Sequence, residues 1–111
     1  MDIEEIKQIN IVSIQNSTNA MAYKTSRELH AIAKYQLDVQ LVKAYIDETI
    51  AKSISYEKAI ILVASLSQEN TSIYKEYLRE EATYKGLEKV IDTNQGQISW
   101  AQSKLKYEER G

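Results

Sequence analysis

The chain has 111 residues, 43% of them apolar and 27% charged, and its 14 basic and 16 acidic side chains leave a net charge of −2. The signs are interspersed, which excludes a basic nucleic-acid-binding arm or an acidic tail. The chain has three glycines and no proline, cysteine or phenylalanine, so it lacks disulfides and most of the turn residues that a β-sandwich or barrel needs.

The first predicted element covers residues 2–15. Asp2 and Glu5 have the spacing of a capping box, and Ile3 and Ile6 then fall on one helical face. The segment 9–14 is rich in β-branched residues and alternates in part, so a short strand stays open as an alternative to a helix.

A polar boundary at residues 15–19 precedes the second predicted helix, over 20–52, in which nothing breaks a helical pattern. Val42, Ile46 and Ile50 widen its apolar stripe, so we expect neighbours on two sides. The stripe itself follows steps of three and four residues and consists of Leu29, Ile32, Ala33, Leu37, Leu41, Ala44, Tyr45, Glu48 and Lys52.

A joint at residues 53–55 separates this helix from a short one predicted over 56–67, with Ser55 as its N-cap. Its centre, 59–66, is apolar on most faces, so we expect it to be the most buried segment. A polar stretch at 68–72 then leads into the last element, with a continuous helix that has a weak middle as the alternative.

The last helix is predicted over 72–108, with Asn70 or Thr71 as its cap and with an apolar seam along one face. The seam keeps its seven-residue phase across the polar stretch 92–97, which favours one helix over the alternative of a break near Asn94. We expect the seam to serve packing or self-association, with Asn94 as a polar layer. Its members are Tyr77, Tyr84, Leu87, Ile91, Asn94, Ile98, Ala101 and Leu105.

Two further features of this helix bear on partners. Gly86 and Gly96 lie inside it, and each costs about 1 kcal/mol relative to alanine, which is tolerable where another helix comes close. Trp100 lies two residues after Ile98, so it points to the outer side of the helix, where it either packs on a neighbouring helix or is a candidate partner contact.

The side chains of catalysis and metal binding occur without the spacing that such chemistry requires. His30 has Glu28 two residues before it, on a different helical face, and no cysteine completes a zinc site. The pairs 80–81 and 108–109 are adjacent carboxylates that do not converge, and no serine has a base placed by a motif. We therefore predict no catalytic residue, no metal, no cofactor and no enzymatic activity, with His30 as a surface or boundary residue and both carboxylate pairs on solvated faces.

Nucleic-acid binding is the weaker alternative. The last helix carries basic residues, but acidic residues accompany them one for one, whereas phosphate binding favours an uncompensated patch. The basic set is Lys75, Arg79, Lys85, Lys89, Lys104, Lys106 and Arg110, and the acidic set is Glu76, Glu80, Glu81, Glu88, Asp92, Glu108 and Glu109.

The segment YKGLEKVIDTNQGQISWAQSKLKYEER, residues 84–110, resembles the C-terminal ends of small all-helical accessory proteins encoded by bacteriophages of low-GC hosts. The resemblance covers about a quarter of the chain and carries no functional residue with it. It implies a helical, oligomeric, non-catalytic protein that binds a host or phage protein or assists DNA transactions.

These observations predict a single all-α domain over 1–111, an antiparallel helical hairpin or small bundle in which the last helix pairs with 20–52. We expect a homo-oligomer, most simply a dimer. The predicted function is a protein–protein interaction module, such as a phage-encoded inhibitor or adaptor of a larger enzyme. The alternatives are an oligomeric nucleic-acid-associated protein and a virion structural component.

The acidic N-terminus and the short longest apolar run, 59–64, predict neither a secretory signal nor a membrane span. We therefore expect a cytoplasmic protein, in the host cell if it is phage-encoded.

Overall fold

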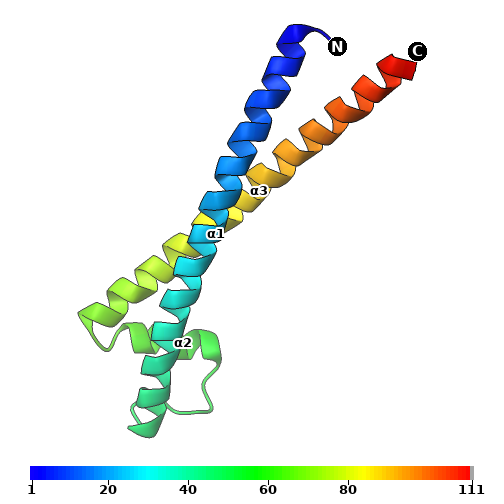
Figure 1. Cartoon of the computed structure of the whole chain (residues 1–111). Coiled ribbons are helices and arrows are strands. Elements are labelled where there is room, and N and C mark those ends of the chain that lie inside the picture. The colour runs from blue at the N-terminus through cyan, green and yellow to red at the C-terminus, as the bar shows by residue number, and fades with distance from the viewer. Residues whose placement is uncertain (111) are drawn as a thin grey trace. The chain divides into compact units, whose positions relative to one another are not determined.

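A computed structural model describes residues 1–110, which form three helices and no strand. These are α1 (Ile3–Ile46), α2 (Tyr56–Ala64) and α3 (Gln68–Arg110), with the long N-terminal and C-terminal helices packed against each other (Figure 1). The predicted all-α class is confirmed, and the alternative of a strand at 9–14 is wrong. No helix in the described part of the chain combines the length and apolar character needed to cross a membrane.

The predicted boundary at residues 15–19 is wrong, because α1 runs through it. The Ser17 and Thr18 hydroxyls each donate to the carbonyl four residues earlier, at 3.3 Å, and so sit within the helix instead of capping a new one. Asn16 is buried and its amide reaches across to α3. The polar cluster is therefore the polar part of a helix–helix contact. At the start of α1 the predicted Asp2 cap is confirmed, since its carboxylate accepts from the Glu5 N–H at 2.8 Å.

The end of α1 lies at Ile46 and not at residue 52. Glu48 adopts a left-handed φ of 58°, and the N–H groups of Glu48 and Thr49 bond back to the carbonyls of Tyr45 and Ala44. This is a Schellman-type stop, which ends the helix without the usual glycine. The predicted continuation of the helical stripe through Glu48 and Lys52 is therefore wrong, and the chain turns so that Ile50 enters the core.

The α2–α3 junction is shorter than predicted. α2 ends at Ala64 and α3 begins at Gln68, four residues before the predicted start at 72. Ser67 is the residue that caps α3, since its hydroxyl accepts from the Asn70 N–H at 3.0 Å. The side chains of Asn70 and Thr71, predicted as caps, instead donate to the last carbonyls of α2, Val63 O at 3.1 Å and Ala64 O at 2.7 Å.

The last helix continues through the polar stretch 92–97, so the prediction of one helix is confirmed and the break near Asn94 is excluded. Gly86 and Gly96 were expected to let another helix come close, and within this chain that expectation is wrong. A Cβ added at Gly86 or Gly96 would meet nothing within 4 Å, so neither glycine makes room for a neighbouring helix of the same molecule.

The chain folds into two compact units, each containing part of α1 and part of α3. The first unit comprises residues 1–25 and 83–111, and the second comprises 26–82. α2 belongs to the second unit alone, so the two units differ in the number of helical segments that pack together.

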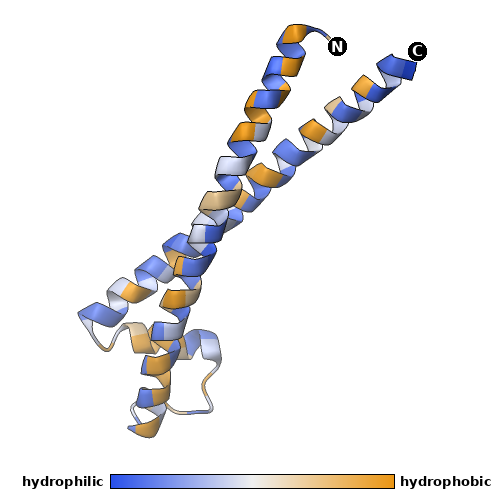
Figure 2. Ribbon diagram, in the orientation of Figure 1, coloured by the Kyte–Doolittle hydropathy of each residue, from blue (hydrophilic) through white to orange (hydrophobic). Residues whose placement is uncertain are grey.

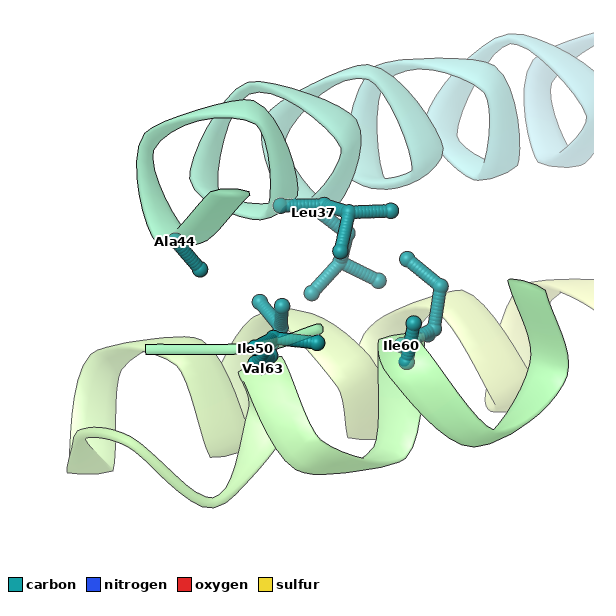
Figure 3. Packing of buried hydrophobic residues seen from close by; sticks show 7 residues of the cluster. Leu37, Ala44, Ile50, Ile60 and Val63 are labelled. Carbon is teal, nitrogen blue, oxygen red and sulfur yellow. The ribbon is translucent and has the colours of Figure 1, made fainter. Parts of the chain in front are cut away.

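The second unit contains an apolar core, shown in close view in Figure 3. Leu37 and Ala44 of α1 point toward Ile60 and Val63 of α2, and Ile50 closes the same cluster from the connection. Leu37 and Val63 are almost completely buried. The centre of α2 was expected to be the most buried segment, and four of its residues are buried, although Ile61 and Leu62 are exposed.

The first unit packs two helical segments with no third. Val12 and Ala101 are its buried apolar residues, alongside Asn16. Many of its large apolar side chains are exposed, and the hydropathy colouring in Figure 2 shows apolar positions distributed along both of its helices. These exposed residues are Ile3, Ile6, Ile11, Ile14, Met21, Val90, Trp100, Leu105 and Tyr107.

Candidate interaction surfaces

The structure places the predicted seam of α3 against α1 of the same chain. Ala101 is buried, most other members are half-buried, and Leu105 at the end is exposed. Tyr84 packs edge-on against Tyr23 in the first unit, with ring centroids 6.2 Å apart, and Tyr77 packs against the core of the second unit. The seam is thus occupied within the molecule. The predicted pairing with 20–52 is right for the second unit only, because residues 83–110 pack with 1–25.

Asn94 lies in the seam as a polar layer. Its amide donates to the Asn16 side-chain oxygen at 3.4 Å, and the Asn16 amide donates to the Ile91 carbonyl at 3.4 Å. A buried polar pair inside an apolar seam fixes which residues face each other, at some loss of stability. The two asparagines therefore set the register of the first unit.

The matching seam of α1 is a set that the sequence analysis missed. Its residues alternate in steps of three and four, and one series is spaced by seven throughout the helix. Several of these positions are polar, so a pattern based on apolar residues alone does not show the series. The seven-residue spacing itself would have identified it. The series is Ile9, Asn16, Tyr23, His30, Leu37 and Ala44, all buried or half-buried.

Glu80 is buried, contrary to the expected solvated face, whereas His30 is half-buried, as a boundary residue would be. The His30 ring stacks on Tyr77 at 4.5 Å, and its Nε2 lies 3.5 Å from a Glu81 carboxylate oxygen. Glu80 is buried, and the Ser26 hydroxyl donates to its carboxylate at 2.6 Å. Both arrangements lie within the α1–α3 contact of the second unit, so they serve packing.

Tyr56 makes a further polar contact within the second unit. Its hydroxyl donates to the Asp38 carboxylate at 2.5 Å, joining the start of α2 to α1. Partial burial, and then the hydrogen bond and the charge of Asp38, raise the pKa of Tyr56 well above its ordinary value of 10.0. The phenol therefore stays protonated and keeps the bond.

A groove of about 630 Å³ lies between the two helices of the first unit. Ile9 and Val12 of α1 and Ile98 and Ala101 of α3 supply apolar lining, and Trp100 borders it with 66% of its surface exposed. Two charged residues of the lining neutralise each other, since Lys104 lies 3.4 Å from Glu5, and the Lys104 ammonium also lies over the Trp100 ring at 5.4 Å. The groove is therefore apolar and electrically balanced. The expectation that Trp100 points outward is confirmed.

A second exposed apolar surface follows the outer face of α1 within the second unit. We call it the outer stripe: Ile32, Tyr35, Val42 and Ile46, spaced by three, seven and four residues. Their exposed fractions run from 54% to 75%, and half-buried Val39 fills the gap in the spacing. The residues that face the core, such as Leu37 and Leu41, lie on the other side of the same helix. The outer stripe therefore lies on a helix whose opposite face is packed in the apolar core.

No family model, curated protein or solved structure matches the chain. Among residues 1–110, no group of three or more His, Cys, Asp or Glu side chains is placed to hold a metal ion. The surfaces themselves are therefore the basis for a functional proposal.

Proposed function

We propose that this protein is a non-catalytic protein–protein interaction module that binds an amphipathic helix of another protein along the outer stripe. The observation that carries the proposal is the exposure of four large apolar side chains in a helical register on one face of α1. An apolar stripe of this width on a helix ordinarily faces a protein neighbour.

The chemistry of the stripe favours a helical protein partner. Tyr35 provides a ring that buries much area while its hydroxyl stays hydrated, as is common at the centre of interfaces. Positions spaced by three and four residues match the anchors of an amphipathic helix, which would add a second helix to α1 as α3 does on the other side. The phage resemblance of residues 84–110 supports the same class of accessory role.

The test is affinity capture from a bacterial lysate with quantitative mass spectrometry, comparing three forms of the full chain. Tyr35→Lys/Val42→Lys places charge on the stripe. Ser72→Lys/Ala82→Lys adds the same charge at exposed positions of α3 in the same unit. We expect a protein that the wild type and the α3 variant retain and that the stripe variant loses. Equal retention by all three forms, or no specific capture by the wild type, would overturn the proposal.

A salt series in a gel-shift experiment separates this function from nucleic-acid binding. Phosphate contacts release counterions, so such binding weakens steeply between low and moderate salt. We expect no shift, since acidic residues accompany the basic ones along α3. A salt-sensitive shift that the stripe variant retains would replace the proposal with the nucleic-acid alternative.

A further inference from the structure

We infer that the first unit is completed by a second copy of this chain, which docks antiparallel along α3 so that Trp100 of each copy packs over Gly96 of the other. The inference concerns the first unit and self-association, and it is independent of the partner proposed for the outer stripe.

The surface is a second stripe on α3, which we call the tryptophan stripe. Its residues follow steps of four and three, the spacing of a coiled-coil seam, on a face of α3 other than the buried seam. All of them are exposed, Trp100 and Tyr107 by 66% and 80%. Thr93, Gly96 and Trp100 of this stripe also border the groove of the first unit. The stripe consists of Lys89, Thr93, Gly96, Trp100, Ser103 and Tyr107.

The order of these side chains makes the stripe complementary to itself. A two-fold axis at the level of Ile98 pairs Gly96 with Trp100, Thr93 with Ser103, and Lys89 with Tyr107 of the other copy. Each large ring thus meets a small side chain or a lysine, and every contact occurs twice, as an isologous interface requires. A parallel arrangement would instead place Lys89 against Lys89 and Trp100 against Trp100.

The charges beside the stripe agree with the antiparallel arrangement. Asp92 and Lys106 are exposed on the same side of the stripe, and the two-fold axis brings that side of each helix against the same side of the other, so Asp92 lies near the other copy's Lys106. Lys89 over the Tyr107 ring adds a cation–π contact at each end. Opposite charges across an interface fix direction and register more than they add affinity.

Gly96 supplies the independent observation. A Cβ there would meet nothing within 4 Å, so this molecule does not itself need the gap that the glycine leaves in a helix interior. Gly96 also borders the apolar groove of the first unit, and an indole placed over it covers that groove's edge. A neighbour that approaches closely at this point explains a residue that is otherwise unfavourable in a helix.

The first experiment measures self-association by sedimentation velocity from micromolar to millimolar concentration. We expect a dimer in the wild type and a loss of affinity of at least roughly tenfold for Trp100→Ala and Gly96→Ala. Two matched controls should leave dimerisation unchanged. Val90→Ala truncates an exposed residue off the stripe, and Gly86→Ala makes the same helix-favouring change opposite Arg110, at the end of the contact.

Circular dichroism checks that the variants still fold. Trp100→Ala and Gly96→Ala should both retain the helical signal of the wild type. A wild type that stays monomeric over the whole range overturns the inference. So does a dimer that Tyr35→Lys/Val42→Lys disrupts and Trp100→Ala does not, since it would place self-association on the outer stripe.

Cysteine cross-linking tests the register, in a chain that has no cysteine of its own. Thr93→Cys and Ser103→Cys chains, mixed and oxidised, should form the mixed disulfide in preference to either homodimer. The two positions lie roughly 15 Å apart along one helix, too far for a bond within a chain. Homodisulfides of Thr93→Cys as the main product would show a parallel pair and overturn the arrangement.

Discussion

The two units of this protein use the same two long helices but are stabilised to different degrees. In the second unit a third helix and the connection before it close an apolar cluster around Leu37 and Val63. In the first unit two helical segments meet along a seam that contains an asparagine pair, and much of their apolar surface is exposed. A helix pair is marginal until a further element covers its apolar faces, so we expect the first unit to be less stable than the second.

Truncation of one core residue in each unit gives the largest expected contrast. Leu37→Ala leaves a cavity in a closed core and should lower the free energy of unfolding by about 3 kcal/mol. Val12→Ala removes fewer buried carbons at a site that solvent borders, so we expect about 1 kcal/mol. Urea unfolding followed by circular dichroism measures both. A larger decrease in the free energy of unfolding for Val12→Ala than for Leu37→Ala would show that the first unit, and not the second, is the better packed.

The asparagine pair sharpens the comparison, because an asparagine in an apolar seam ordinarily lowers stability, so that Asn94→Leu alone would be expected to raise it. The structure changes that expectation, since Asn94→Leu removes the Asn94 amide that donates to the buried Asn16 oxygen. We expect the single variant to lose about 1 kcal/mol and Asn16→Leu/Asn94→Leu to exceed the wild type, since replacing both partners removes the desolvation cost. Thermal unfolding of the two single variants and the double variant completes a double-mutant cycle. A double variant less stable than either single variant would contradict the expectation.

Much of the fold follows from the sequence, and the exceptions have physical causes. The seven-residue phase of Tyr84, Ile91 and Ile98 predicts both the continuity of α3 and the face that it buries. The end of α1 does not follow, because Glu48 adopts a backbone conformation that usually signals glycine. The continuity of α1 through Asn16 does not follow from the sequence either. A polar cluster can cap a helix or form a polar layer between two helices, and its residue types are the same in both cases.

The candidate surfaces were less predictable than the fold. Trp100 was identified as outward-facing from its place relative to Ile98, and that position could be deduced from helical geometry alone. The outer stripe was not, because Val42 and Ile46 predict a neighbour on a second side of the helix, whereas the structure leaves both exposed. Spacing defines which residues share a face, but only packing shows which face is covered.

The hydrogen bond between Tyr56 and Asp38 predicts a smaller, pH-dependent effect confined to the second unit. Because the pKa of Tyr56 is raised in the folded state, its contribution is complete below the ordinary tyrosine pKa of 10.0 and is lost as the pH rises above that value. We expect Tyr56→Phe to lose about 0.5 kcal/mol near neutral pH, since the ring is partly exposed. Urea midpoints of the two proteins should converge above pH 10.0, and a gap that persists there would show that the bond is not the cause.

Residue-resolved amide hydrogen exchange at low and high protein concentration tests the difference between the units most directly. We predict that protection of residues 83–110 rises with concentration, as a second copy covers the tryptophan stripe, while protection of the core around Leu37 and Val63 stays the same. Protection that is independent of concentration throughout residues 83–110, and as strong there as in the core, would contradict the account.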